Sequence, residues 1–199
     1  MAKRPIFEEV SESSARATAA RPTAARVTIE APSGARRAIR AWLYLLFALV
    51  AAMIVVGGLT RLTGSGLSIT DWRPLSGAIP PLSAGDWARE FDAYRQIDQY
   101  QLVNRGMTLG EFQFIYWWEW GHRQLGRFIG LVWGLGFVWF WLRGQIPPGW
   151  TRRLVLLGAL GGAQGAIGWW MVSSGLTEGM VAVASYRLAV HLGLAFVIL

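Results

Sequence analysis

The feature that most constrains this chain is an uncharged, apolar run from Ala41 to Thr60. At a helical rise of about 1.5 Å per residue, about 20 residues cross the hydrocarbon core of a bilayer, which is about 30 Å thick. The run therefore predicts a transmembrane helix. Three more apolar stretches follow, over 112–142, 154–172 and 181–199. Together they predict an all-α fold, a polytopic membrane protein with a four-helix transmembrane bundle whose last helix is truncated at Leu199.

Composition supports a membrane protein and excludes several classes of site. Hydrophobic residues make up 53% of the chain, and many of the 12 tryptophans lie at the ends of apolar runs, where interfacial anchors belong. The net charge is +7, but the basic residues form no stripe interleaved with aromatics, so we expect no nucleic-acid partner. Without cysteine, disulfides, thiolate zinc sites, iron–sulfur clusters and thioether-attached haem are excluded.

Domain organisation follows from the same pattern. Residues 1–40 are rich in Ala, Ser, Thr and Arg and predict a disordered cytoplasmic tail. Residues 41–199 form the predicted four-helix bundle. It includes a long loop over 61–111, which contains several glycines and prolines. Within this loop we expect a short helix from Ser83 to Tyr94.

The distribution of arginine predicts the orientation. Arginines concentrate before the first helix and between the second and third, and these ends are expected to be cytoplasmic. They are Arg36, Arg37, Arg40, Arg143, Arg152 and Arg153. The N-terminus is then cytoplasmic, the long loop lies outside, and a multi-pass location in the cell inner (plasma) membrane is expected.

The chain has only two histidines, and both fall inside predicted membrane helices. The topology places His122 and His191 in the outer half of the membrane, where they could face each other across one site. Ionisable groups within a membrane are costly, so each is a candidate functional residue. Glu119 precedes His122 by three residues and projects from the same helix face. We predict that the histidines bind a haem iron, and Glu119 is a candidate functional residue beside them.

Three arginines accompany the histidines. Arg187 precedes His191 by one turn, and Arg123 and Arg127 lie a turn apart on the second helix. Guanidinium groups bind carboxylates in a bidentate manner, so we predict that all three contact haem propionates. The third helix carries a series of glycines that would let a flat ligand or another helix approach closely.

Structural alternatives remain open for each of these residues. An intramembrane histidine can form a helix–helix hydrogen bond, and Glu119 can pair with Arg123 as a structural ion pair. The arginine side chains can extend to the membrane–water interface and place their charged groups in water without binding a ligand. The tryptophans at 117, 118 and 120 can form an interfacial belt rather than a stacking site, and the glycines can serve packing alone.

Four motifs occur in order and resemble haem A synthases. They are GGLTRLTGSGLSITDWRPLSGAIPP (57–81), the stretch from Asn104 through Glu111 and Phe112 to EWGHRQLGR (119–127), QGAIGWWMVSSGL (164–176) and YRLAVHL (186–192). The resemblance covers residues 41–199. It implies the first half of an eight-helix protein made of two similar four-helix bundles, each with a histidine pair.

The resemblance also implies roles and partners. Glu119, His122 and His191 match the half of the family that takes haem O as substrate, whereas the other half holds a haem b and is absent from this sequence. Some members carry a cysteine pair in the first outer loop, so this chain resembles the cysteine-free class. The implied partners are a haem O synthase and the assembly machinery of terminal oxidases, and a homo-oligomer is left open.

The function implied is that of an oxidoreductase, which hydroxylates a ring methyl of haem O successively until a formyl group results. Two alternatives use the same histidines: a non-enzymatic bis-histidine diheme electron carrier, and a haem chaperone for oxidase assembly. A prenyltransferase is disfavoured, because no Asp-x-x-x-Asp cluster is present to bind a diphosphate through magnesium.

Overall fold

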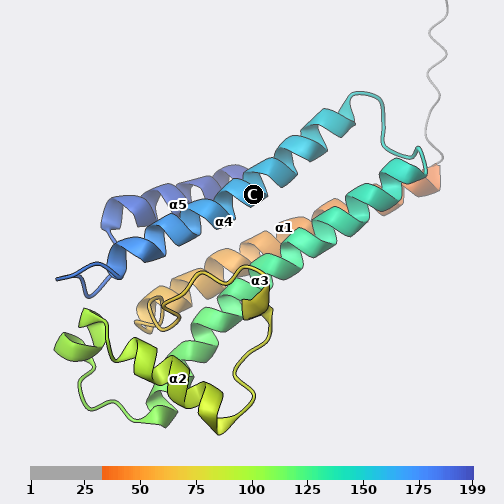
Figure 1. Cartoon of the computed structure of the whole chain (residues 1–199). Helices are drawn as coiled ribbons and strands as arrows, with labels where there is room; N and C mark the ends of the chain where they lie inside the picture. Colours follow the sequence, from red (N-terminus) through yellow and green to blue (C-terminus); the bar gives the residue numbers. More distant parts are fainter. Residues whose placement is uncertain (1–32) are drawn as a thin grey trace, which may run out of the picture. The chain divides into compact units, whose positions relative to one another are not determined.

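The computed structural model describes residues 33–199, and every regular element within them is a helix (Figure 1). This confirms the predicted all-α fold. The long helices are α1 (Ser33–Leu62), α3 (Leu109–Leu142), α4 (Trp150–Gly175) and α5 (Ser185–Ile198). Between α1 and α3 lie the 3-10 helix η1 (Ser76–Ala78), the helix α2 (Ala84–Tyr94) and the π-helix η2 (Gln99–Val103).

The four long helices alternate in direction and form a bundle (Figure 1). α1 packs against α3, α3 against α4, α4 against α5, and α5 against α1. We call the end that carries the α1–α3 and α4–α5 connections the loop end. The opposite end, which carries the start of α1 and the α3–α4 connection, we call the arginine end.

The long helices have the length and surface of membrane spans. α1, α3 and α4 are each long and apolar enough to cross a bilayer, and α5 is an apolar helix of 14 residues. Large apolar side chains remain exposed along them, among them Phe47, Leu135, Leu156 and Val197. Surfaces of this kind suit contact with lipid tails. The chain is thus a multi-pass membrane protein.

The start of α1 differs from the prediction. Residues 33–40 were expected to belong to a disordered tail, but they form the first turns of α1. Alanine and arginine favour the helix, and Ala35 and Ile39 are buried, so the helix has reason to continue beyond the uncharged run. The rest of the predicted tail, residues 1–32, lies outside the described residues.

The start of α5 also lies later than predicted. The apolar stretch begins at Val181, but the helix begins at Ser185. Ala184 is extended, with φ −60° and ψ 127°, and its N–H donates to the Ser174 hydroxyl at the end of α4. This bond satisfies a backbone donor outside the helix and marks its boundary.

Capping boxes determine where α2 and α3 begin. The Ser83 hydroxyl accepts from the backbone of Asp86, whose carboxylate accepts from the backbone of Ser83. Thr108 and Glu111 form the same reciprocal pair at the start of α3. The short helix expected within the loop is therefore confirmed as α2, and α3 extends three residues before the predicted apolar stretch.

An aromatic core holds the α1–α3 connection against α3. It consists of buried residues from the connection and from the first turns of α3: Ile69, Phe91, Tyr94, Phe112, Ile115 and Tyr116. Phe91 and Phe112 stack with ring centroids 4.8 Å apart. Because this core lies at the loop end, it brings the residues around Ser68 close to Glu119.

Candidate haem site

Each histidine packs against a glycine on a neighbouring helix. A Cβ placed on Gly57 of α1 would lie 3.0 Å from Cε1 of His122, and one placed on Gly168 of α4 would lie 2.9 Å from Cε1 of His191. Only glycine lets each imidazole lie this close to the facing backbone. His122 of α3 thus lies against α1, and His191 of α5 lies against α4. That the two imidazoles face each other across one site stays a prediction.

Within residues 33–199, neither imidazole forms a helix–helix hydrogen bond. Nδ1 of His122 and Nδ1 of His191 are both buried, and no described residue partners them. The described residues contain no group of three or more His, Cys, Asp or Glu side chains that could hold a metal ion. Two imidazoles without other ligands suit a haem, because the porphyrin supplies the remaining bonds to iron. The residues present fit a bis-histidine haem.

The backbone at His191 is held by Gln164. Its Nε2 donates to the His191 carbonyl oxygen at 2.9 Å, which joins α4 to α5 at the level of the imidazole. The Gln164 Oε1 is buried without a described partner. In the sequence, Gln164 was only the first residue of the third motif, and this contact was not predicted.

Glu119 is buried, with 3% of its surface exposed, and has three donors. Its Oε1 accepts from Arg123 at 2.6 Å, and its Oε2 accepts from the Ser68 hydroxyl at 2.8 Å and the Ile69 N–H at 2.9 Å. The ion pair weighed as an alternative from the sequence is therefore present. The carboxylate also anchors the loop, one turn from His122 toward the loop end.

Arg123 and Arg127 bind the backbone of the loop after α1. Their acceptors, 2.9–3.1 Å away, are the carbonyl oxygens of Ile69 and Asp71 for Arg123 and of Arg73 and Pro74 for Arg127. Gln124, between them, donates to the Ala78 carbonyl at 2.9 Å. Side chains of α3 thus fasten the loop along one side of the helix. The predicted contact of these arginines with propionates stays a prediction.

Arg187 lies on the other helix pair. Its guanidinium donates to the Trp170 carbonyl at 2.7 Å and lies over the Trp170 ring, 4.5 Å from the centroid. Trp169, the neighbour of Trp170, stacks on Trp72 of the loop with centroids 5.6 Å apart. These contacts join the end of α4 to the first turn of α5 and to the loop after α1. A propionate contact for Arg187 also stays a prediction.

Sequence reasoning missed Ser68 and Gly57 as parts of this site, and it considered Gly168 only as one of the glycines of the third helix. Ser68 lies 51 positions from Glu119, so no local pattern signals their contact. The two glycines were available as a signal, since glycine inside a helix is unfavourable and often marks a close approach. Only the packing of the bundle identifies which of the many glycines face a histidine.

Known proteins similar to this chain indicate its family. A model of the cytochrome oxidase assembly protein family matches residues 40–199. Curated relatives named haem A synthase include those of Dinoroseobacter shibae, 69% identical over 99% of this chain, and Paracoccus denitrificans, 63% identical over 100%. In both cases the match covers 51% of the relative, so the chain spans about half the length of the curated relatives it matches. No solved structure matches. Since the family model covers the whole bundle and both histidines, the chain belongs to the cytochrome oxidase assembly protein family.

Proposed function

We propose that this chain forms the substrate-binding half of a haem A synthase, an oxidoreductase that converts a ring methyl of haem O into a formyl group. The observation that carries the proposal is the pair of imidazoles, each packed on a glycine and free of hydrogen bonds to described residues, with a buried carboxylate one turn away. The name shared by the relatives, haem A synthase, supports the same function.

In this proposal, His122 and His191 hold the iron of haem O and so fix the ring relative to α3. A fixed ring turns the reaction with a neighbouring group into an effectively intramolecular one. Each of two successive hydroxylations would exchange a methyl C–H bond for a C–OH bond, with the hydroxyl oxygen from water, two protons released to a base and two electrons passed to an electron acceptor. The second hydroxylation would give a hydrate that loses water to leave the formyl group. The resemblance further implies a haem b, bound by residues outside this chain, which supplies electron transfer.

Glu119 is the proposed catalytic residue. Oxidation of a methyl group releases protons and develops positive charge. A nearby carboxylate can accept a proton or stabilise the positive charge. A carboxylate has about four acceptor sites, and three donors engage Glu119, so one site remains for a proton or for substrate. Ser68, the Ile69 N–H and Arg123 would hold the group in place during the reaction.

Location and partners are part of the proposal. The arginine end carries Arg143, Arg152 and Arg153 in or beside the α3–α4 connection, which favours a cytoplasmic position for that end in the inner membrane. The N-terminus would then be cytoplasmic and the loop end outside. A haem O synthase would supply the substrate within the membrane, and the terminal oxidase assembly machinery would receive the product. Arg123, Arg127 and Arg187 remain the proposed propionate contacts.

The test is mass-resolved extraction of haem from cells that make haem O, with and without the full-length protein, followed by the same measurement on Glu119→Gln. Glutamine keeps an oxygen for the loop donors, whereas alanine would leave Arg123 unpaired and cost about 3–5 kcal/mol. Glu111→Gln is the matched control, because Glu111 is an exposed carboxylate on the same helix that serves only a cap.

We expect haem A with the wild type and with Glu111→Gln. With Glu119→Gln we expect haem O alone, bound with an unchanged bis-imidazole spectrum. Loss of bound haem in Glu119→Gln would make Glu119 a structural residue only. Unchanged haem O with the wild-type protein would favour the electron carrier or the haem chaperone instead.

A further inference from the structure

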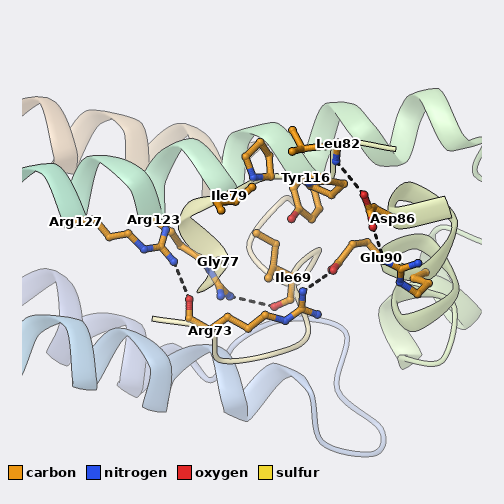
Figure 2. A pocket seen from close by; sticks show the side chains of 13 residues that line it. Ile69, Arg73, Gly77, Ile79, Leu82, Asp86, Glu90, Tyr116, Arg123 and Arg127 are labelled. Carbon is orange, nitrogen blue, oxygen red and sulfur yellow. Dashed lines mark hydrogen bonds and ion pairs between the residues drawn. The ribbon is translucent and has the colours of Figure 1, made fainter. Parts of the chain in front are cut away.

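A cavity lies at the loop end of the bundle, and neither histidine lines it. It has a volume of about 360 Å³ and is enclosed by the loop after α1, the helix α2 and one side of α3 (Figure 2). Four arginines line it: Arg73, Arg89, Arg123 and Arg127. Its lining includes only two acidic side chains, Asp86 and Glu90.

The acidic side chains of the cavity are already paired. Glu90 accepts from Arg73 at 2.6 Å, and Asp86 pairs with Arg89. Hydrogen bonds from Arg73 to Asp71 and to Glu90 raise the pKa of the Arg73 guanidinium above its usual value, so it stays charged. Arg127 differs from the other three, because no described carboxylate pairs with it. A bound anion would therefore find uncompensated positive charge at Arg127.

Tyr116 supplies a free donor at the same place. The residue is 4% exposed, and its ring packs edge-on against Trp87 with centroids 5.0 Å apart. Figure 2 shows its hydroxyl directed into the cavity, and no described residue forms a hydrogen bond with it. A buried hydroxyl usually finds a partner, and one that opens into a cavity beside a cation is placed to donate to an anion.

The rim of the cavity is apolar and exposed. Ile79 and Leu82 both line it, yet 68% and 78% of their surfaces are exposed, and Leu75 nearby is 88% exposed. Counting back from Leu142, about 20 residues of α3 cross a hydrocarbon core of about 30 Å, which brings the membrane boundary close to Arg123. The cavity thus lies at the level of lipid headgroups, with apolar side chains available to the adjoining acyl region.

We propose that this cavity binds the phosphate headgroup of an anionic phospholipid, with the Tyr116 hydroxyl and Arg127 as donors and with Leu75, Ile79 and Leu82 against the acyl chains. A phospholipid fits better than a soluble anion because its acyl chains would also cover these exposed apolar side chains. The bound lipid would stabilise the loop after α1, which Glu119 and Arg123 bind to α3. The proposal assigns Arg127 to the lipid rather than to a haem propionate, and in other respects it does not depend on haem chemistry.

The experiment is native mass spectrometry of the full-length protein in detergent, titrated with phosphatidylglycerol and with phosphatidylcholine of the same acyl chains. The main variant is Tyr116→Phe, which removes one hydroxyl and preserves the packing of the ring. Arg127→Gln is the second variant. Arg61→Gln is the matched control, because Arg61 is an exposed arginine at the same end of the bundle and outside the cavity.

We expect phosphatidylglycerol to bind more tightly than phosphatidylcholine, and we expect Tyr116→Phe to weaken it about tenfold, the usual effect of losing one hydrogen bond to a charged group. Arg61→Gln should bind as the wild type does. Equal binding of both lipids, wild-type affinity in Tyr116→Phe, or an equal loss in Arg61→Gln would overturn the proposal. Displacement of the lipid by millimolar inorganic phosphate would also overturn it, since the site would then bind a soluble anion.

Discussion

Replacing Gly168 by alanine tests whether the backbone of α4 positions the His191 imidazole. The new Cβ would lie 2.9 Å from Cε1 of His191, whereas ordinary contacts are 3.4–4 Å, so the ring or the helix must move by about 0.5 Å or more. Overpacking of this kind costs about 1–3 kcal/mol, of which the better helix propensity of alanine recovers about 0.5–1 kcal/mol. At 1.4 kcal/mol per tenfold change, the affinity for haem O should fall by up to about 60-fold.

The measurement is a titration of the full-length apoprotein with haem O, followed by the bis-imidazole absorption spectrum. Gly165→Ala is the matched control, because a Cβ on Gly165 of the same helix would meet nothing within 4 Å. We expect Gly165→Ala to bind haem O as the wild type does. Equal affinity in the two variants would refute the view that close approach of the His191 ring to α4 determines how haem O is held.

Two further predictions concern the loop end. Ser68→Ala removes a donor 2.8 Å from the buried Glu119 carboxylate and should lower the free energy of unfolding by about 1.5–3 kcal/mol, seen as a lower melting temperature in detergent; an unchanged melting temperature would contradict this. Hydrogen bonds from Ser83 lower the pKa of Asp86 below its ordinary value of 3.8, so the cap stabilises α2 fully above that pH and is lost as the pH falls through the folded pKa. The protection factors of the amides at the start of α2, measured by hydrogen exchange and corrected for the intrinsic pH dependence of exchange, should therefore fall at low pH, and Asp86→Asn should remove this fall.

The predicted helices were recovered because their signals are local. An uncharged run such as 41–60 has one stable state in a bilayer, since the helix alone satisfies every backbone group within its own segment. The ends were less predictable. The start of α1 depends on buried contacts of Ala35 and Ile39, and the start of α5 depends on a hydrogen bond to Ser174, a residue of the preceding helix.

The candidate site divides in the same way. His122, His191 and Glu119 could be identified from the sequence alone. Ionisable residues inside a membrane are energetically costly and rare, and they usually have a function. The residues that contact these three side chains could not be predicted from the sequence. The Glu119 partners at Ser68 and Ile69 and the loop carbonyls bound by Arg123 are separated from α3 by about 50 positions, and only folding brings them together.

The sequence by itself determined the membrane class, the number of apolar helices and the residue types able to hold an iron. These follow from hydropathy, from helical geometry and from the absence of cysteine, none of which needs a neighbour. Only the tertiary structure decided that the arginines of α3 bind the loop, that Tyr116 opens into a cavity, and which glycines admit the histidine rings. The physical reason is that hydrogen bonds and close packing act over a few ångströms, so they depend on which distant segments meet.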